Sequence, residues 1–395
     1  MLSKYAGRAL SDALPAFCVT DITFCCHRFV ISSIYLCRRN SNGLRIKEED
    51  DMNRLMLLSA MLCISTAVSA QDETKKVDIT PHIGGTIRSK YEYQTEEGEG
   101  RFEVRTARVN VKGNLTPVVS YTAEIDLCDE GKIKMLDAYT RLKPWKGWQF
   151  TIGQMRVPFT IDAHRSPHLQ YFANRSFIAK QVGNVRDVGA AIGYTFHPGF
   201  PVILEAGMFN GSGLTNQKDF WTNKVNFSAK AQMLFPCGVN LVLSTQKIQP
   251  DNVNVMMYDA GLTYHRGGLI AEVEYLYKHY QDDAFKAVHA FDSFVSYDIP
   301  LRSKLFTKVS PLARYDFMTD HSDGTRYLNG VTDTKGTLIV NDSKRGRLTG
   351  GVTFSLAKPF SSDIRVNYEK YFYGHDATPK TSEKDKIVVE FVTHF

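Results

Sequence analysis

The sequence has no apolar run long enough to cross a membrane as a helix. Such a helix needs roughly 20 predominantly apolar residues. The nearest approach, 16–37, is interrupted by Asp21, His27 and Arg28. No amphipathic helix of useful length is predicted further along the chain either. A protein that spans a membrane without such helices must be a closed barrel, because only helices and closed barrels satisfy every backbone group in lipid.

A strong excess of charge of either sign is also missing. The 395 residues carry 48 Lys and Arg against 42 Asp and Glu, a formal net charge of +6. This balance argues against a nucleic-acid partner, which calls for a concentrated basic face. Of the seven cysteines, only Cys128 and Cys237 follow residue 70. They fall in different predicted turns, so they establish no disulfide, and two thiols are too few for a metal site.

Recognisable catalytic patterns are absent as well. The chain contains no G-x-S-x-G, H-E-x-x-H or G-K-[ST] motif. No catalytic residue, cofactor or metal is therefore predicted, and we expect that the protein is not an enzyme. Ser and His do occur in the long predicted loops, so a barrel hydrolase stays open as an alternative.

The N-terminal part contains a predicted export signal at 52–70. Arg54 precedes an apolar stretch at 55–68, and small residues end at Ala70, just before the polar Gln71. A buried helix is the alternative. Residues 1–51 are rich in cysteine and show no sustained period, so we interpret them as a non-native extension from a misassigned start, with Met52 as the true start. The predicted mature domain is 71–395.

From residue 77 onward, apolar and polar residues alternate with a period of two, which is typical of β-strands. Tight turns such as 266–268 contrast with long loops such as 210–221 and 320–343. The pattern predicts sixteen strands, near 77–94, 101–115, 118–128, 132–143, 147–156, 187–196, 201–209, 222–235, 238–248, 253–266, 268–279, 288–299, 304–318, 344–356, 361–374 and 385–395.

The character of the two strand faces separates a barrel from a soluble β-sandwich. The polar face carries full charges in strand after strand, and the apolar face draws on 24 Phe, 19 Tyr and 3 Trp. Sixteen strands enclose an interior too wide for side chains to fill, so charged residues can point into water. We therefore predict an all-β protein, a closed antiparallel transmembrane β-barrel of the bacterial outer membrane. Ala229 is assigned to the lipid face and Ser228 to the water face.

The stretch 151–189 breaks the alternation. Pro158 and Pro167 remove donors from any strand ladder. Connections this long are uncommon in compact domains unless they are functional or disordered, and the apolar residues of this one argue against disorder. We predict a constriction loop that folds into the barrel; a surface lid or crossover is the alternative. The predicted constriction and anion-binding residues share a basic side chain: Arg156, Arg165, Arg175, Lys180 and Arg186 of the loop region, with Arg108 and Lys112 of the wall.

Rings of Arg or Lys in a narrow pore favour anions, because they raise the local anion concentration and repel cations. Arginine suits phosphate through its bidentate geometry. The alternative is that individual arginines pair with wall carboxylates such as Glu124 and Asp126 and hold the loop in place.

Several motifs, in order, resemble the phosphate-selective porin O and P family. They are RFEVRTARVNVKG at 101–113, LDAYTRLKPWKGWQFTIGQMRVPF at 136–159, NRSFIAKQVGNVRDVGAAIGY at 174–194 and FNGSG at 209–213. The resemblance implies a sixteen-stranded homotrimeric porin that passes phosphate or other anions. One arginine of the family's paired pattern is missing at 105–108, and Asn174 replaces the usual acidic residue before Arg175, so the anion preference rests on the loop.

The C-terminal segment KIVVEFVTHF, which ends at Phe395, resembles the segment that the barrel-assembly machinery reads in outer-membrane proteins, although Thr393 departs from the usual residue. The predicted function is passive diffusion of small, preferentially anionic solutes of the phosphate type across the outer membrane, with outer-membrane lipid around the barrel. The alternatives are a weakly selective general porin and a loop-plugged surface-binding or structural barrel.

Overall fold

The computed structural model describes residues 77–129, 132–182, 185–214, 217–249, 253–283, 285–319, 327–328, 331–332, 343–358, 362–374, 377 and 379–395. The predicted extension at 1–51 and the predicted signal peptide at 52–70 lie outside these residues. Within the described part of the chain, no helix is both long and apolar enough to cross a membrane.

Sixteen long strands form one sheet. They are β1 (His82–Gln94), β2 (Gly100–Asn114), β3 (Val119–Asp129), β4 (Lys132–Leu142), β5 (Trp148–Arg156), β6 (Arg186–Phe196), β7 (Val202–Phe209), β8 (Asn226–Leu234), β9 (Val239–Ile248), β10 (Val255–Arg266), β11 (Leu269–Tyr280), β12 (Val288–Tyr297), β14 (Phe306–Met318), β17 (Arg345–Leu356), β18 (Ser362–Tyr373) and β19 (Lys386–His394).

The remaining elements are short: strands β13 (Ile299–Pro300), β15 (Tyr327–Leu328) and β16 (Val331–Thr332), 3-10 helices η2 (Pro167–Leu169), η4 (Gln281–Asp283) and η5 (Thr381–Glu383), and helix α3 (Phe177–Gln181).

Each predicted strand corresponds to one long strand, and the ends differ by a few residues. The first strand begins at His82 rather than at 77, because Thr80 N–H bonds the Asp78 side chain in a local turn (2.9 Å). The eighth begins at Asn226 rather than at 222, because Thr222 and Lys224 hydrogen-bond each other within the preceding loop. Side-chain bonds of this kind compete with strand pairing.

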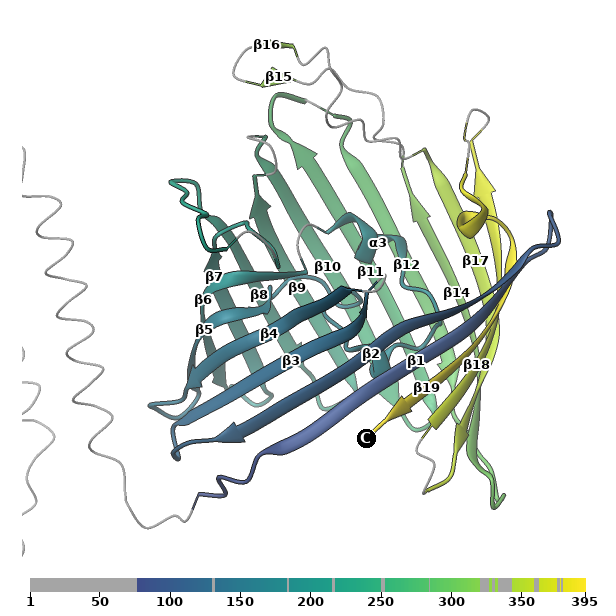
Figure 1. Ribbon diagram of the computed structural model, residues 1–395, viewed down its shortest axis with the longest axis horizontal. Helices are drawn as coiled ribbons and strands as arrows, with labels where there is room; N and C mark the ends of the chain where they lie inside the picture. The colour runs from purple at the N-terminus through teal and green to yellow at the C-terminus, as the bar shows by residue number, and fades with distance from the viewer. Residues whose placement is uncertain are drawn as a thin grey trace, which may run out of the picture. The chain divides into compact units, whose positions relative to one another are not determined.

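The sheet closes on itself. Consecutive long strands pair antiparallel around the barrel, and the short strand β13 adds two residue pairs to β14. The first and last strands, β1 and β19, pair from Thr86↔His394 to Gln94↔Lys386 (Figure 1). Closure leaves no unpaired edge, as a strand barrel in lipid requires. The prediction of a closed antiparallel barrel of sixteen strands is confirmed.

The two faces of the wall are inverted relative to a water-soluble protein. On β1, the inward residues Arg88, Lys90 and Glu92 are buried, whereas the outward residue Ile83 is 69% exposed. On β2, Phe102 is 87% exposed. This apolar outside and polar inside is the arrangement of a transmembrane β-barrel, and it confirms the predicted faces.

The expectation that Ser228 faces water is wrong. Ser228 does point inward, but it is only 1% exposed, because its hydroxyl donates to the carbonyl oxygen of Pro158 at 2.6 Å. The loop therefore covers this part of the inner wall.

The described part of the connection between β5 and β6, residues 157–182 and 185, crosses the barrel interior and binds the wall. Lys230 Nζ donates to the carbonyl oxygen of Thr160 at 2.7 Å. The backbone N–H groups of Ile161 and Asp162 donate to the two oxygens of Glu274 at 2.5 and 3.3 Å. Loop backbone groups that water would otherwise satisfy are thus satisfied by inward side chains of β8 and β11.

Wall arginines hold the second half of the loop. Arg88 donates to the carbonyl oxygen of Ala173 at 2.9 Å, Arg314 to that of Asn174 at 2.9 Å, and Arg347 to that of Arg175 at 2.7 Å. Guanidinium groups suit this role, because five N–H donors in one plane can serve a carboxylate and a carbonyl at once.

The same arginines are neutralised from the wall. Arg88 pairs with Glu390 at 2.6 Å, and Arg347 pairs with Asp316 at 2.7 Å and Glu369 at 3.4 Å, all nearly inaccessible to solvent. A buried charge without a partner carries a large desolvation cost. These salt bridges therefore offset the cost of burying charged side chains of the inner wall beneath the loop.

Helix α3 gives the loop an apolar anchor. Ser176 caps it, accepting from Ala179 N–H at 3.4 Å, and Phe177 and Ile178 are fully buried. They pack in a cluster with Met257, Leu276, Val288 and Met318 of the surrounding strands. The guanidinium carbons of Arg345 and Arg347 lie 4.9 and 4.8 Å from the Phe177 ring centre, within the range of cation–π attraction.

Replacing Ala229 with Arg tests the face assignment. Ala229 lies on the outer wall in mid-strand, so a charge there should destabilise the folded barrel by about 2–4 kcal/mol in a bilayer. The matched control is Thr122→Arg on the inner face beside open space, where the cost should be small. Urea titration of folding into lipid vesicles measures both; equal costs would contradict the assignment.

Replacing Asp162 with Asn tests the loop anchor. Asp162 accepts from Ser176 N–H and Oγ at 3.0 Å each and from Arg165 at 3.3 Å. Burial raises the pKa of Asp162, but the charges of Arg175 and Arg165 outweigh it and hold the pKa below its ordinary value. Its anchoring should therefore persist from neutral pH down to about pH 4 and be lost as pH falls through this lowered pKa.

Loss of the buried charge should weaken loop anchoring by about 3–5 kcal/mol. Asp162→Asn should then show more protease cleavage within 157–182 and noisier single-channel current at pH 7, with an intact barrel. The exposed Asp219→Asn should behave like the parent protein. An equally quiet and resistant Asp162→Asn would show that the loop is held elsewhere.

Candidate functional site

The inward loop divides the barrel interior into two unequal parts. On the side of β8 to β19 and β1, it packs against the wall through the contacts described above, and a cavity of about 270 Å³ remains there beside loop residues 168–171. On the side of β2 to β7, an open cavity of about 340 Å³ remains between the loop and the wall. Any solute that crosses the barrel through this space passes between loop residues and the inward side chains of β2 to β7.

Two of the seven predicted site residues line this cavity with cationic groups that have no carboxylate partner. Lys112 is exposed, and no ion pair involves it within the described residues. Arg156 donates to the carbonyl oxygens of His164 and Arg165 at 3.0 and 3.2 Å. These partners are neutral carbonyl groups, so they orient the guanidinium and form no salt bridge with it.

Two further predicted residues, Arg186 and Arg108, lie in salt bridges with wall carboxylates. Arg186 pairs with Asp137 at 2.8 Å and with Glu124 at 2.9 Å. Arg108 pairs with Asp126 at 3.0 Å and with Glu124 at 3.4 Å. These arginines therefore cancel the acidic side chains that would otherwise face the cavity.

The other three predicted residues hold the loop. Arg165 pairs with Glu272 at 2.5 Å and with Asp162 at 3.3 Å. Arg175 donates to the carbonyl oxygens of Asp162 and Arg165. Lys180 is exposed and pairs with Glu383 at 2.8 Å. The alternative in which some arginines pair with carboxylates thus describes most members of the set.

One cavity-lining cation was not predicted. Arg141 of β4 points into the cavity, donates to Thr151 Oγ1 at 3.1 Å and lies 5.2 Å from the Tyr139 ring centre. Its signal in the sequence was its place on the same strand face as Tyr139 and Asp137, two and four residues away.

Histidines also border the cavity. The rings of His168 and His394 stack at 3.9 Å with an angle of 8° between them, joining the loop to the last strand. Burial, with the charges of His394 and Lys112, lowers the pKa of His168 to about 4. Burial, with the charges of Lys230 and Arg156, lowers the pKa of His164 well below its ordinary value. At neutral pH, these two loop histidines add no charge to the cavity.

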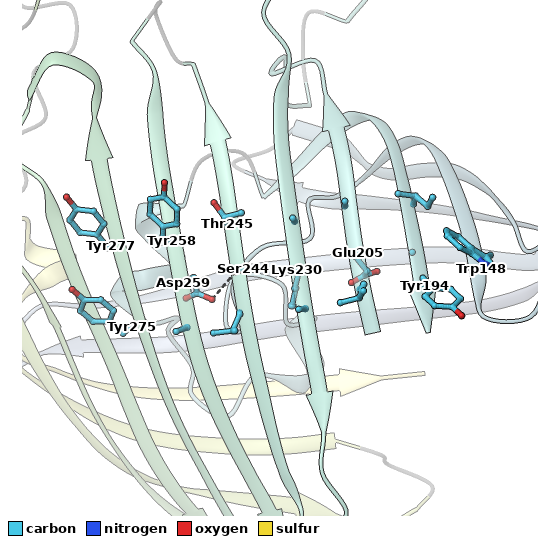
Figure 2. Close-up of a pocket in the computed structure, with 18 residues that line it drawn as sticks. Trp148, Tyr194, Glu205, Lys230, Ser244, Thr245, Tyr258, Asp259, Tyr275 and Tyr277 are labelled. Carbon is cyan, nitrogen blue, oxygen red and sulfur yellow. Dashed lines mark hydrogen bonds between the residues drawn. The ribbon is translucent and has the colours of Figure 1, made fainter. Parts of the chain in front are cut away.

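A larger depression, about 880 Å³, lies on the outer wall of β5 to β11 and is not a solute site (Figure 2). Its floor carries the small residues Ala206, Ala229 and Ala260, and tyrosines such as Tyr258 and Tyr275 flank it. Polar side chains of the same strands, Asp259 among them, are buried on the opposite face. The depression therefore faces lipid.

Both cysteines after residue 70 are free thiols: Cys128 is half-buried and Cys237 is exposed.

Comparison with known structures places the fold. The trimer form of OmpT, an outer membrane protein of Vibrio cholerae, is 11% identical with a TM-score of 0.51, covering 80% of this chain and 98% of that chain. An anion-selective porin from Comamonas acidovorans is 12% identical with a TM-score of 0.52, covering 80% and 99%. OmpF of Salmonella typhi, in complex with daunomycin, is 12% identical with a TM-score of 0.54, covering 80% and 97%.

Identities this low carry the fold alone. No curated protein sequence matches the chain. A family model, however, matches residues 82–250, the segment that contains the inward loop and the cavity-lining strands β2 to β7. The closed barrel, its apolar outer face and this match together make the protein an outer-membrane porin. Over residues 82–250, the chain matches the family described as phosphate-selective porin O and P.

Proposed function

We propose that this porin passes small anions, with phosphate as the representative solute, in preference to cations. The observation that carries the proposal is the set of three cavity-lining cations without a carboxylate partner: Lys112, Arg141 and Arg156. Uncompensated cations beside a narrow aqueous path raise the local anion concentration. The guanidiniums of Arg141 and Arg156 can also bind phosphate oxygens through paired N–H donors.

The other predicted site residues take supporting roles in this proposal. Arg108 and Arg186 neutralise Glu124, Asp126 and Asp137, which would otherwise attract cations. Arg165, Arg175 and Lys180 hold the loop beside the cavity through the contacts described above.

One observation favours a weakly selective general porin as the second candidate. Glu205 lines the same cavity, and its one side-chain hydrogen bond in the described residues comes from Gln149 Nε2 at 3.4 Å. A carboxylate that keeps its charge beside the path would attract cations and reduce the anion preference. A loop-plugged surface-binding or structural barrel would, in contrast, conduct almost no current.

We further propose that the protein is a homotrimer and that its last residue is read during barrel assembly. The trimer form of the similar Vibrio cholerae protein supports the first part. For the second, Phe395 is backbone-paired with Gly85 in both directions, at 2.9 and 3.2 Å, yet remains 59% exposed. The C-terminal aromatic residue is thus placed by the barrel and accessible from outside.

Charge reversal in the cavity tests the anion preference. The parent pore should give a zero-current potential on the anion side in a KCl gradient across a planar bilayer. A variant with Lys112→Glu, Arg141→Glu and Arg156→Gln should lower the anion-to-cation permeability ratio by about tenfold or more. Gln at 156 keeps donors for the loop carbonyls. Arg302→Glu, on an exposed turn, is the control.

A cation-selective parent pore would favour the second candidate, and a barrel without measurable conductance would favour the plugged alternative. An unchanged permeability ratio in the variant would show that selectivity arises outside this cavity.

The trimer proposal predicts a particle of three chains. Detergent-purified protein, analysed by light scattering with the detergent contribution subtracted, should have a protein mass about three times that of its boiled form. A monomeric mass in mild detergent would contradict the proposal.

A further inference from the structure

Four acidic side chains come together where the loop meets the wall, away from the proposed solute path. Asp259 lies on β10, Glu272 and Glu274 on β11, and Asp292 on β12, and each is at most 5% exposed. One carboxylate oxygen from each of Glu272, Glu274 and Asp292 lies within 4.8 Å of the others. Asp259 lies two residues from Gly261, the cross-strand partner of Glu274.

The wall places like charges directly opposite each other. Glu274 and Asp292 are cross-strand partners in the antiparallel register of β11 and β12. Like charges in this position destabilise a sheet. Burial makes the repulsion stronger, because the surrounding dielectric is low.

The basic residues nearby compensate this charge only in part. Arg165 Nη2 lies 2.5 Å from Glu272, and Arg314 Nε lies 3.8 Å from Asp292. No cation within the described part of the chain lies within 4.0 Å of Asp259 or Glu274. The nearby Lys230 instead donates its hydrogen bond to the carbonyl oxygen of Thr160.

Several carboxylate oxygens of the cluster are buried without any hydrogen-bond partner. Asp259 Oδ1 accepts from Ser244 at 3.0 Å, whereas its Oδ2 accepts from no group (Figure 2). Glu272 Oε1 is likewise unpartnered, and Asp292 Oδ1 accepts no hydrogen bond, although Arg314 Nε lies 3.8 Å from it. Buried polar atoms in native proteins nearly always have a partner, so these oxygens point to a bound group that carries positive charge.

We propose that this cluster binds one hard divalent cation, for which Ca²⁺ is the probe. All the available ligand atoms are carboxylate oxygens, the type that Ca²⁺ prefers. Ca²⁺–oxygen distances are about 2.3–2.6 Å, so oxygens within 4.8 Å of one another can contact one ion without a change in the backbone.

The bound ion also stabilises the loop. Glu274, which it neutralises, accepts the backbone N–H groups of Ile161 and Asp162. An ion at this site therefore removes the repulsion among wall residues and keeps Glu274 in place as the acceptor for the loop.

Direct binding measurement on the full barrel tests the proposal. The protein is freed of lipopolysaccharide, which itself binds divalent cations, then stripped with EDTA and dialysed against Ca²⁺ before elemental analysis. We expect one Ca²⁺ per chain and a higher thermal unfolding temperature in its presence. Glu274→Gln and, separately, Asp292→Asn should raise the Kd for Ca²⁺ by tenfold or more. Asp363→Asn, a half-exposed carboxylate on β18, should leave it unchanged.

Two results would overturn the proposal. The first is a parent protein that retains no Ca²⁺ at millimolar concentration, which would mean that protons alone neutralise the cluster. The second is Ca²⁺ binding that both cluster variants leave unchanged, which would mean that the ion lies elsewhere. A folded barrel migrates differently on SDS gels before and after boiling. If one variant shows no such difference, it has not folded, and Ca²⁺ binding by the parent protein and by the other variant tests the proposal.

Discussion

The closed ring of backbone hydrogen bonds is the constraint on which the rest of the structure depends. Lipid offers no partner for an N–H or C=O group, so each of the sixteen long strands must bond on both edges. The pairing of β1 with β19 satisfies the last free edge. Once the ring is closed, alternate residues must face lipid, and the polar residues between them face inward. The inner face is therefore polar whether or not water reaches it.

Much of that inner face is dry, because the loop at 157–182 covers it. Salt bridges and hydrogen bonds between buried polar groups offset the resulting desolvation cost. Wall arginines such as Arg88 and Arg347 bind a carboxylate on the wall and a carbonyl group on the loop at the same time. One guanidinium thus satisfies two groups that burial would leave without partners. The charged wall residues that the loop buries are thus the same residues that hold it in place.

Pairing also determines which charges remain for a solute. Where the loop meets the wall, arginines are used to hold backbone and carboxylate groups. On the opposite side, Arg108 and Arg186 are used to cancel acidic residues. Lys112, Arg141 and Arg156 keep their charge because no carboxylate lies within salt-bridge distance of them in the described part of the chain. The proposed anion selectivity thus depends on the basic side chains that form no salt bridge in the folded barrel.

The strands were predictable because their signal is local. Alternation with a period of two depends only on neighbouring residues, and it correctly assigned sixteen strands and their faces, including Ala229 outside and Ser228 inside. The loop was predictable for a similar reason: Pro158 and Pro167 interrupt the ladder within one continuous stretch. What alternation cannot report is whether an inward residue meets water or another part of the chain. The prediction for Ser228 failed on this point.

The sequence by itself thus determined the barrel, the orientation of its faces and the position of the loop. Only the tertiary structure decided which basic residues pair. Arg165 meets Glu272 across 107 positions, and Arg186 meets Asp137 across 49. Such partners are set by strand order and by the path of the loop through the barrel. The seven predicted cations look alike in the sequence, yet they separate into loop anchors, neutralised wall residues and uncompensated charges, because a salt bridge depends on distance in space and not along the chain.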